Sequence, residues 1–268
     1  MLFKDHLCLL RGGGDLATGV ALRLHRCGFP VAVCELEKPL AVRRTVAMST
    51  AVAAGEVTVE GMSARRVDNL NDVTTVAATG VVPVLVSPQL PDLGRFPRSV
   101  VIDARLMKLN TDTTLEDAPL VVALGPGYTA GLDCHVVVET LRGPRIGRVI
   151  TAGTASPDTR VPGEVGGQST KRLVRAPADG LVIWNRRIGD RVEAGEVLGH
   201  IGAQPVISDL TGMVRGLIAD GTSVRSGTKV GDVDPRGSRA TIEEVSDKAL
   251  AVGGGVLEAV LSWLDHGQ

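Results

Sequence analysis

The sequence predicts an α/β protein with a mostly parallel sheet, followed by a small all-β domain and a C-terminal helix. Three observations support this prediction. Short apolar runs alternate with helical patterns through the first half of the chain. A glycine-rich loop joins the first of these runs to a helical pattern. Two copies of a glycine and valine pattern then follow each other 32 residues apart. We place the α/β domain at residues 1–170, the β domain at 171–237 and the helix at 238–268.

The N-terminal segment has the pattern of a strand, a glycine loop, a helix and a second strand. The apolar run Leu7–Leu10 is followed by the glycine loop, a helical face and then Val31–Cys34. The loop matches the dinucleotide fingerprint of Rossmann-like domains, in which glycines admit a phosphate to a helix N-terminus. The acid at the end of the second strand stands where a ribose hydroxyl would bind. The candidate cofactor residues here are Arg11, Gly12, Gly13, Gly14, Asp15, Ala17 and Glu35.

Two alternatives stay open for this loop. The glycines can serve only the close packing of a helix on a sheet, with no ligand. Arg11 can pair with a phosphate, or it can be a solvated residue at the end of a strand.

Further strands and helices are expected along the rest of the domain. Strands are expected at Val57–Val59, Val82–Val86, Val100–Ile102, Leu120–Leu124, Val136–Val138 and Arg148–Ile150, and helices at Ala41–Ala54 and Asn71–Thr79. Together with the first two strands, they predict a Rossmann-like sheet whose ligands bind at the carboxyl ends of its strands.

A second glycine loop, with Gly125 and Gly127, follows the strand Leu120–Leu124 and is a further candidate for cofactor binding. Other polar residues lie at or beside strand ends, where carboxylates serve either chemistry or plain turn capping. The candidate catalytic residues are Asp103, Cys134, Glu139 and Arg142, and whether the chain catalyses a reaction is left open. Cys134 is either a thiolate or a buried strand residue. No spacing of His and Cys predicts a metal site.

The basic pair Arg43 and Arg44 is a candidate partner for a phosphate or carboxylate, because guanidinium groups bind such oxyanions in a bidentate way. The alternative is a pair of exposed, solvated charges. A final helical pattern covers Ile242–Leu264, with Ser246 as a candidate N-cap and a break expected at Gly253–Gly255. Its apolar face predicts a homo-oligomer.

The internal repeat occupies the expected β domain. Its equivalent residues, 32 apart, are Gly180 and Gly212, Gly189 and Gly221, Val192 and Val224, Gly195 and Gly227, and Gly199 and Gly231. The pattern predicts two interlocked halves of a small antiparallel sandwich, and it resembles the barrel-sandwich hybrid of biotinyl and lipoyl domains. The turn between the halves, Ile201–Val206, lacks the lysine that carries the prosthetic group, so we expect neither lipoate nor biotin.

Composition excludes several classes of protein. A formal net charge of −1 and only 2% aromatic residues disfavour a nucleic-acid partner. The most apolar stretch, Val81–Val86, is too short to span a membrane. The four cysteines form no CxxC pair, so we expect reduced thiols in a cytoplasmic protein.

Several blocks of the sequence together resemble the YqeB family of selenium-dependent molybdenum hydroxylase accessory proteins. These blocks are Arg11–Gly19, Glu37–Arg44, Ala51–Gly61, Ala123–Gly127, Val138–Gly143 and Gly231–Arg236. The resemblance implies a role in maturing a molybdenum hydroxylase, which would be the partner protein, with the molybdenum cofactor or a nucleotide as the ligand. The alternative, based on the glycine fingerprint and Glu35, is an NAD-dependent oxidoreductase.

Overall fold

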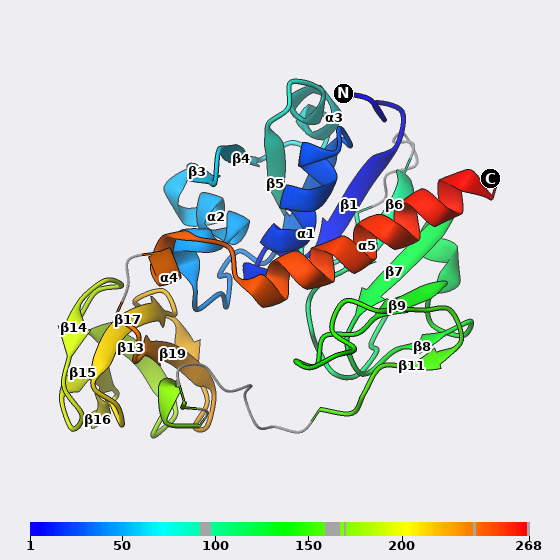
Figure 1. The fold of residues 1–268 in the computed structure, drawn as a ribbon. Helices are drawn as coiled ribbons and strands as arrows, with labels where there is room; N and C mark the ends of the chain where they lie inside the picture. Colours follow the sequence, from blue (N-terminus) through cyan, green and yellow to red (C-terminus); the bar gives the residue numbers. More distant parts are fainter. Residues whose placement is uncertain (92–97, 159–166, 169, 238–239, 267–268) are drawn as a thin grey trace. The chain divides into compact units, whose positions relative to one another are not determined.

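The structure is a computed structural model that describes residues 1–91, 98–158, 167–168, 170–237 and 240–266. Its chain forms two compact units (Figure 1). The first unit comprises Met1–Glu37, Ala47–Asp158 and Val245–Gln268, and the second comprises Lys38–Val46 and Thr159–Glu244, apart from the residues outside the described ranges. Of the long loop Gly153–Gly167, residues 159–166 lie outside the described residues. Each unit is described by itself below.

The first unit is built on a nine-stranded sheet with the strand order β10-β9-β7-β6-β1-β2-β5-β4-β3. Its strands are β1 (Leu7–Arg11), β2 (Val31–Glu35), β3 (Glu56–Val59), β4 (Met62–Val67), β5 (Val82–Val86), β6 (Arg98–Asp103), β7 (Leu120–Leu124), β9 (Val136–Val138) and β10 (Val149–Ile150). Two short strands, β8 (Thr129–Ala130) and β11 (Gly153–Thr154), form a separate two-stranded sheet.

The large sheet is mixed. The strands from β9 to β4 are all parallel, whereas β10 and β3 at the two edges run antiparallel to their neighbours. At one edge Glu60 and Gly61, both with positive φ, turn β3 directly into β4. The strand β4 itself was not predicted, because its pattern contains the pair Arg65 and Arg66 and lacks an apolar run.

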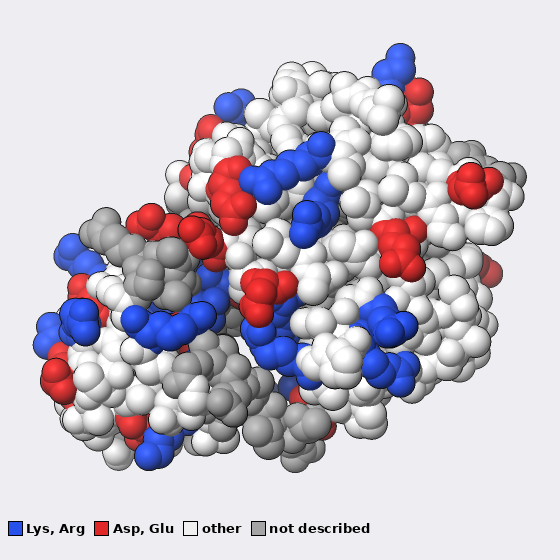
Figure 2. Space-filling model, in the orientation of Figure 1, with Lys and Arg blue, Asp and Glu red and all other residues white. Residues whose placement is uncertain are grey.

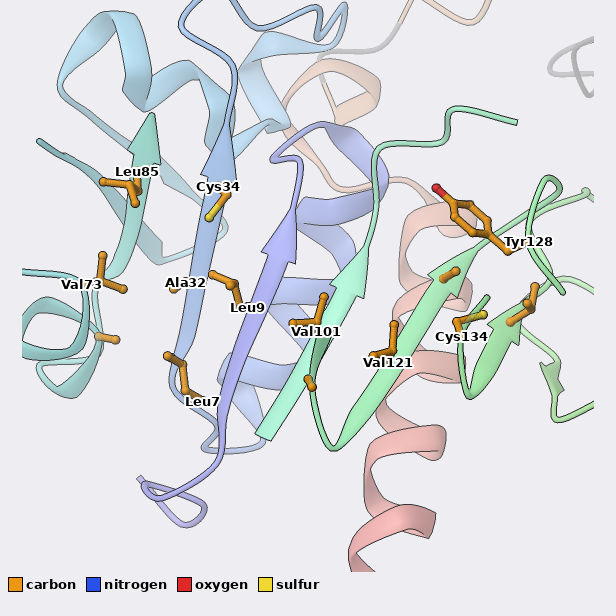
Figure 3. Packing of buried hydrophobic residues seen from close by; sticks show 14 of the residues in the cluster. Leu7, Leu9, Ala32, Cys34, Val73, Leu85, Val101, Val121, Tyr128 and Cys134 are labelled. Carbon is orange, nitrogen blue, oxygen red and sulfur yellow. The ribbon is translucent and has the colours of Figure 1, made fainter. Parts of the chain in front are cut away.

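Helices cover both faces of this sheet. They are α1 (Asp15–Arg26), α2 (Ala51–Ala54), α3 (Asp72–Ala78) and α5 (Asp247–Asp265). Figure 3 shows α1 and α5 behind the sheet, with Leu9, Val101 and Val121 on its opposite face. The expected helix Ala41–Ala54 is wrong as a single element, because this stretch contains the 3₁₀ turns Arg44–Val46 and Met48–Thr50 and only one α-helical turn, α2.

Helix α5 continues through Gly253–Gly255, so the expected break there is wrong. Its predicted N-cap is confirmed, since the Ser246 hydroxyl accepts a hydrogen bond from the backbone N–H of Ala249 at 3.1 Å. The helix packs along α1 in the first unit, and this packing compensates for the low helix propensity of glycine.

The second unit contains two four-stranded antiparallel sheets, β12-β19-β17-β14 and β16-β15-β13-β18. The strands are β12 (Leu173–Arg175), β13 (Gly180–Trp184), β14 (Arg191–Val192), β15 (Val197–Ile201), β16 (Gln204–Ile207), β17 (Gly212–Leu217), β18 (Ser223–Val224) and β19 (Lys229–Asp234). The two repeat copies exchange strands, because β14 of the first pairs with β17 of the second and β18 pairs with β13. A short helix, α4 (Ala240–Glu243), also belongs to this unit.

The expected fold class is therefore wrong, although the chain is α/β in general. We expected a Rossmann-like, mostly parallel sheet with a barrel-sandwich hybrid and a terminal helix. The structure instead has one large mixed sheet with antiparallel edges and several antiparallel sheets. The physical reason is that an apolar run reports the burial of a strand but not its neighbour or its direction.

Candidate functional site

The carboxyl ends of β1 and β6 lie next to each other in the large sheet, with Arg11 opposite Asp103. From this point the strand order runs from β1 to β2 on one side and from β6 to β7 on the other. In open α/β sheets, ligands bind beyond the carboxyl ends of strands where the strand order reverses in this way. The residues at this pair of strand ends therefore form the candidate site.

Arg11 is buried at the end of β1, with only 3% of its surface exposed. Its Nη2 donates to Asp112 Oδ2 at 2.5 Å and its Nη1 donates to Thr113 Oγ1 at 3.0 Å. Asp117 adds a longer ion pair, with 3.9 Å between its Oδ2 and Arg11 Nη1. Arg11 is not a solvated residue at a strand end, because its side chain is buried and is paired with carboxylates of its own chain. Its pairing with a phosphate stays a prediction.

Asp103 lies at the end of β6 and is fully buried. Arg105 forms a bidentate ion pair with it, in which Nε lies 3.0 Å from Oδ1 and Nη2 lies 2.5 Å from Oδ2. The Thr113 hydroxyl donates a hydrogen bond to Oδ2 at 2.6 Å. Burial alone would raise the pKa of Asp103, but the bonds from Arg105 and Thr113 outweigh it and hold the pKa below its usual value. Asp103 is thus a charged, fully engaged carboxylate.

Asp112 joins the two arginines. Its Oδ2 accepts from Arg11 and its Oδ1 accepts from Arg105 Nη2 at 2.7 Å, while 43% of its side chain remains exposed. Partial burial opposes ionisation, but the hydrogen bonds from Arg105 and Arg11 hold the pKa of Asp112 well below its usual range. Sequence reasoning missed Asp112 and Thr113. They lie in the loop that follows β6, and no sequence pattern indicates that this loop folds back over the end of the strand.

The Tyr128 side chain lies near the carboxyl end of β7, the neighbour of β6 in the sheet (Figure 3). It is 1% exposed, and its hydroxyl has no geometrically sound hydrogen-bond partner among the described residues. Burial and the nearby Asp103 carboxylate raise the pKa of Tyr128, so the phenol stays protonated. The site therefore holds a buried, neutral phenol beside the Asp103 carboxylate.

The first glycine loop is partly occupied by the protein itself. The backbone N–H of Gly13 donates to Glu35 Oε1 at 2.9 Å, and that of Leu36 donates to Glu35 Oε2 at 2.5 Å. Burial raises the pKa of Glu35, and these two hydrogen bonds oppose that shift. A Cβ on Gly13 would lie 3.0 Å from the backbone nitrogen of Ser49, so a neighbouring segment also covers the loop.

The remaining residues of this loop differ in their surroundings. Gly12 has φ +96° and packs against the Ala104 backbone, so it needs its glycine conformation. Gly14 faces open space, since no atom lies within 4 Å of a Cβ placed there. Asp15 and Ala17 are in the first turn of α1, and Ala17 is buried. The open part of the loop is therefore at Gly14.

The second glycine loop is a packing element. A Cβ on Gly125 would lie 2.5 Å from Thr140 Oγ1, and one on Gly127 would collide with the Lys108 backbone.

Cys134 lies after this loop, buried and 0% exposed. Burial and then the charge of Asp133 raise the pKa of its thiol to about 12, so the residue is a thiol at neutral pH.

Glu139 and Arg142 each hold another part of the chain. The fully buried Glu139 accepts hydrogen bonds from the backbone N–H groups of Leu141 and Ser156, each at 2.8 Å. Burial opposes ionisation, but these bonds hold the pKa of Glu139 below its usual value. Arg142 forms a bidentate ion pair with Asp247 at the start of α5. These contacts give both residues a role in positioning loops.

Arg43 and Arg44 belong to the second unit. Arg43 is buried and donates to the carbonyl oxygen of Glu244 at 2.9 Å, and Arg44 donates to that of Leu217 at 2.7 Å. Burial lowers the pKa of Arg44, with Asp220 opposing the shift. The expected alternative of two exposed, solvated charges does not describe Arg43, which is 4% exposed.

The fold and this site define an α/β protein with a paired arginine and aspartate cluster at the carboxyl edge of its sheet. Over 261 residues, the chain is 47% identical to Uncharacterized protein YqeB of Escherichia coli (strain K12), an alignment that covers 97% of this chain. This similarity supports the resemblance to the YqeB family. The chain spans 48% of the length of that relative. No protein-family model matches the chain.

Two solved structures also show weak similarity. One is a succinylglutamatedesuccinylase/aspartoacylase from Rhodobacter sphaeroides, 15% identical with 85% of each chain covered and a TM-score of 0.25. The other is an aspartoacylase family protein from Mesorhizobium loti, 13% identical with 85% of each chain covered and a TM-score of 0.26. TM-scores this low carry no argument about the present chain.

Within the residues that the structure describes, no helix is long and apolar enough to cross a membrane.

Proposed function

We propose that the chain is a cytoplasmic accessory factor in the maturation of a selenium-dependent molybdenum hydroxylase. In this proposal it binds a phosphate-bearing ligand, the molybdenum cofactor or a nucleotide, at the carboxyl ends of β1 and β6. The observation that carries the proposal is the position of Arg11 and the open Gly14 beside the point where the strand order reverses. The YqeB resemblance supplies the biological role.

Local charge is important for such a site. On the face shown in Figure 2, basic and acidic side chains are interspersed. With a formal net charge of −1, the chain has no large positive field to attract an anion. The ligand would therefore depend on a few guanidinium and backbone N–H groups at the strand ends.

The alternative, an NAD-dependent oxidoreductase, gains less support from the geometry. It requires Glu35 to accept hydrogen bonds from a ribose, but both Glu35 oxygens already accept backbone N–H groups. A ribose would have to displace at least one of these bonds. We therefore favour a binding protein, which would show no turnover of NAD with candidate substrates.

The proposal is tested by native mass spectrometry of the chain from a host that makes molybdenum cofactor. We expect a bound mass that corresponds to the cofactor or to a nucleotide. The variant Gly14→Val fills the open space at Gly14, whose φ of −73° suits any residue, and it should fold but lose the ligand. Gly254→Val is the matched control, because its Cβ position on α5 is also open. A folded Gly14→Val protein that keeps the ligand would remove Gly14 from the site.

The proposed partners are the target hydroxylase and a second copy of this chain. Co-purification with a molybdenum hydroxylase and the molar mass in solution test these two partners separately. If the chain binds neither a phosphate-bearing ligand nor a hydroxylase, the proposed function is wrong.

A further inference from the structure

The loop that connects β6 to the 3₁₀ turn Leu115–Asp117 places one carboxylate between two guanidinium groups. The two oxygens of Asp112 accept separately from Arg11 Nη2 at 2.5 Å and from Arg105 Nη2 at 2.7 Å. Each of these arginines has a further partner, Thr113 for Arg11 and Asp103 for Arg105. Arg105 therefore keeps a partner outside the loop when Asp112 leaves, whereas Thr113, the partner of Arg11, moves with the same loop.

We propose that Arg11 and Arg105 form a binding site for a phosphoryl group, and that Asp112 occupies it as a displaceable internal anion. This inference rests on the proposed function, and it names the anchoring residues and the regulation of that site. Two guanidinium groups that converge on one oxyanion are a common arrangement for binding phosphate or carboxylate. Arg11 is reached by such a group only when Asp112 leaves, since Arg11 is 3% exposed and Asp112 is 43% exposed.

The charge of the cluster indicates the kind of phosphoryl group. Arg11 and Arg105 are balanced by Asp103 and by Asp117, whose Oδ2 lies 3.9 Å from Arg11 Nη1, so Asp112 adds one further negative charge. A phosphoryl group with one negative charge, as in a diester or a pyrophosphate bridge, replaces Asp112 without changing this balance. A group with two charges adds repulsion from the remaining carboxylates.

The backbone of the same loop is under strain. Leu106 and Lys108 have φ values of +57° and +65°, in the left-handed region that side chains other than glycine rarely adopt. Met107 and Leu109 beside them are largely exposed, at 47% and 69%. A strained and exposed segment of this kind opens more easily than the buried strand ends beneath it.

Several contacts hold the loop closed. Lys108 pairs with Asp158 at 2.6 Å, and the Asn110 side chain donates to Asp133 Oδ1 at 3.0 Å. The Asn110 side chain accepts from the backbone N–H of Thr113 at 2.9 Å, and the Asn110 N–H donates to the Gly127 carbonyl oxygen at 3.0 Å. Nearby, the buried Tyr128 hydroxyl has no hydrogen-bond partner of sound geometry among the described residues.

The test is isothermal titration of the full chain with the symmetrical dimethyl diester of pyrophosphate (hereafter pyrophosphate), in which each phosphoryl group carries one negative charge. Asp112→Asn removes the internal anion, and we expect it to bind pyrophosphate about tenfold or more tightly than wild type, because a site that is mostly closed weakens apparent affinity by its open fraction. The matched control is Asp68→Asn, which removes an aspartate paired with Arg66 at 2.8 Å on the same unit and should leave affinity unchanged. The double variant Arg11→Gln/Asp112→Asn should lose the gain.

A folded Asp112→Asn protein that binds pyrophosphate no more tightly than wild type overturns the proposal. A gain for succinate in place of pyrophosphate overturns the phosphoryl assignment. If the variant does not fold, hydrogen exchange of wild type decides the question: pyrophosphate must speed exchange of the Thr113 amide, which is bonded to Asn110. Unchanged exchange at a concentration of pyrophosphate that binds the protein is evidence against a displaced loop.

These outcomes separate the inference from the proposed function. A gain in pyrophosphate affinity in a chain that carries no natural ligand and binds no hydroxylase supports the site while removing the maturation role. A natural ligand that binds wild type and Asp112→Asn equally supports the role and overturns the internal anion.

Discussion

Gly19 of α1 and Gly253 of α5 lie so close together that neither position has room for a side chain. A Cβ on Gly253 would lie 2.5 Å from the Gly19 carbonyl oxygen, and a Cβ on Gly19 would lie 2.5 Å from that of Ala249. Gly255 is similarly close to the Gly147 backbone, whereas Gly254 faces open space. The glycine run is therefore a packing surface, which is why α5 continues through it.

This packing predicts opposite effects for two neighbouring substitutions. Gly253→Ala should lower the free energy of unfolding by about 2 kcal/mol, because the helices must separate to admit a methyl group. Gly254→Ala should raise it by up to about 1 kcal/mol through helix propensity alone. Urea denaturation of both variants measures the difference. Equal effects at the two positions would contradict close contact between α1 and α5.

The charge on Asp103 is expected to stabilise the fold. Asp103→Asn should lower the free energy of unfolding by about 3 kcal/mol at neutral pH, since Arg105 then loses its buried counter-ion. The exposed variant Asp68→Asn should change it by less than about 1 kcal/mol. Denaturant titration gives both values, and similar losses would mean that the strand-end cluster adds no special stability.

The same carboxylate predicts the direction of a pH effect. The pKa of Asp103 is lower in the folded protein than its ordinary value, so its stabilisation is fully present above the ordinary value. It is lost as the pH falls below about 4 and through the folded-state pKa. The difference in stability between wild type and Asp103→Asn should therefore shrink on acidification. A difference that does not change with pH would show that the lost charge is not its cause.

Glu139 is expected to act in structure and not in chemistry. Glu139→Gln leaves either Leu141 or Ser156 without a carboxylate acceptor, so the free energy of unfolding should fall by about 1–3 kcal/mol. Ligand binding by the folded variant should be unchanged. Glu56→Gln, which breaks an exposed pair with Arg65, serves as a control with little effect. If a stable Glu139→Gln protein no longer binds the ligand, Glu139 belongs to the ligand-binding site after all.

The four cysteines are expected to differ in reactivity. Cys27 is exposed, whereas Cys8, Cys34 and Cys134 are buried. Burial also raises the pKa of Cys8 and Cys134, which keeps these two residues as thiols. A thiol reagent at pH 8 should modify one cysteine quickly in the native protein and all four after denaturation. Cys27→Ser should abolish the fast phase, and a fast phase that persists would locate a second reactive thiol.

Local sequence patterns predicted many elements of the first unit correctly. The strands at Val82–Val86, Leu120–Leu124 and Val136–Val138 are confirmed with their bounds, as is the strand, glycine loop and helix order at the N-terminus. Burial explains this success, because short runs of Val, Leu and Ile between turn residues are typical of fully buried strands. The helix expected at Ala41–Ala54 failed because an apolar stretch of that length can also pack as short turns.

The candidate site was predictable only in part. Arg11, Asp103 and the glycines stand next to strands that the pattern located, so their place at the strand ends followed from local sequence. Asp112 and Thr113 lie in a loop with no regular pattern, and their partners at Arg11 are about a hundred residues away. No local signal encodes a hydrogen bond across that separation.

By itself, the sequence determined that its apolar runs are buried, where most of the turns lie, and which polar residues end the first strands. The repeat spaced at 32 residues likewise marked Gly180 and Gly212, the residues at which β13 and β17 begin. Only the tertiary structure decided that the large sheet is mixed, that β14 and β18 change partners, and that Asp112 bridges two arginines. The physical reason is that burial is a property of each segment, whereas direction, pairing and charge contacts depend on segments that meet only after folding.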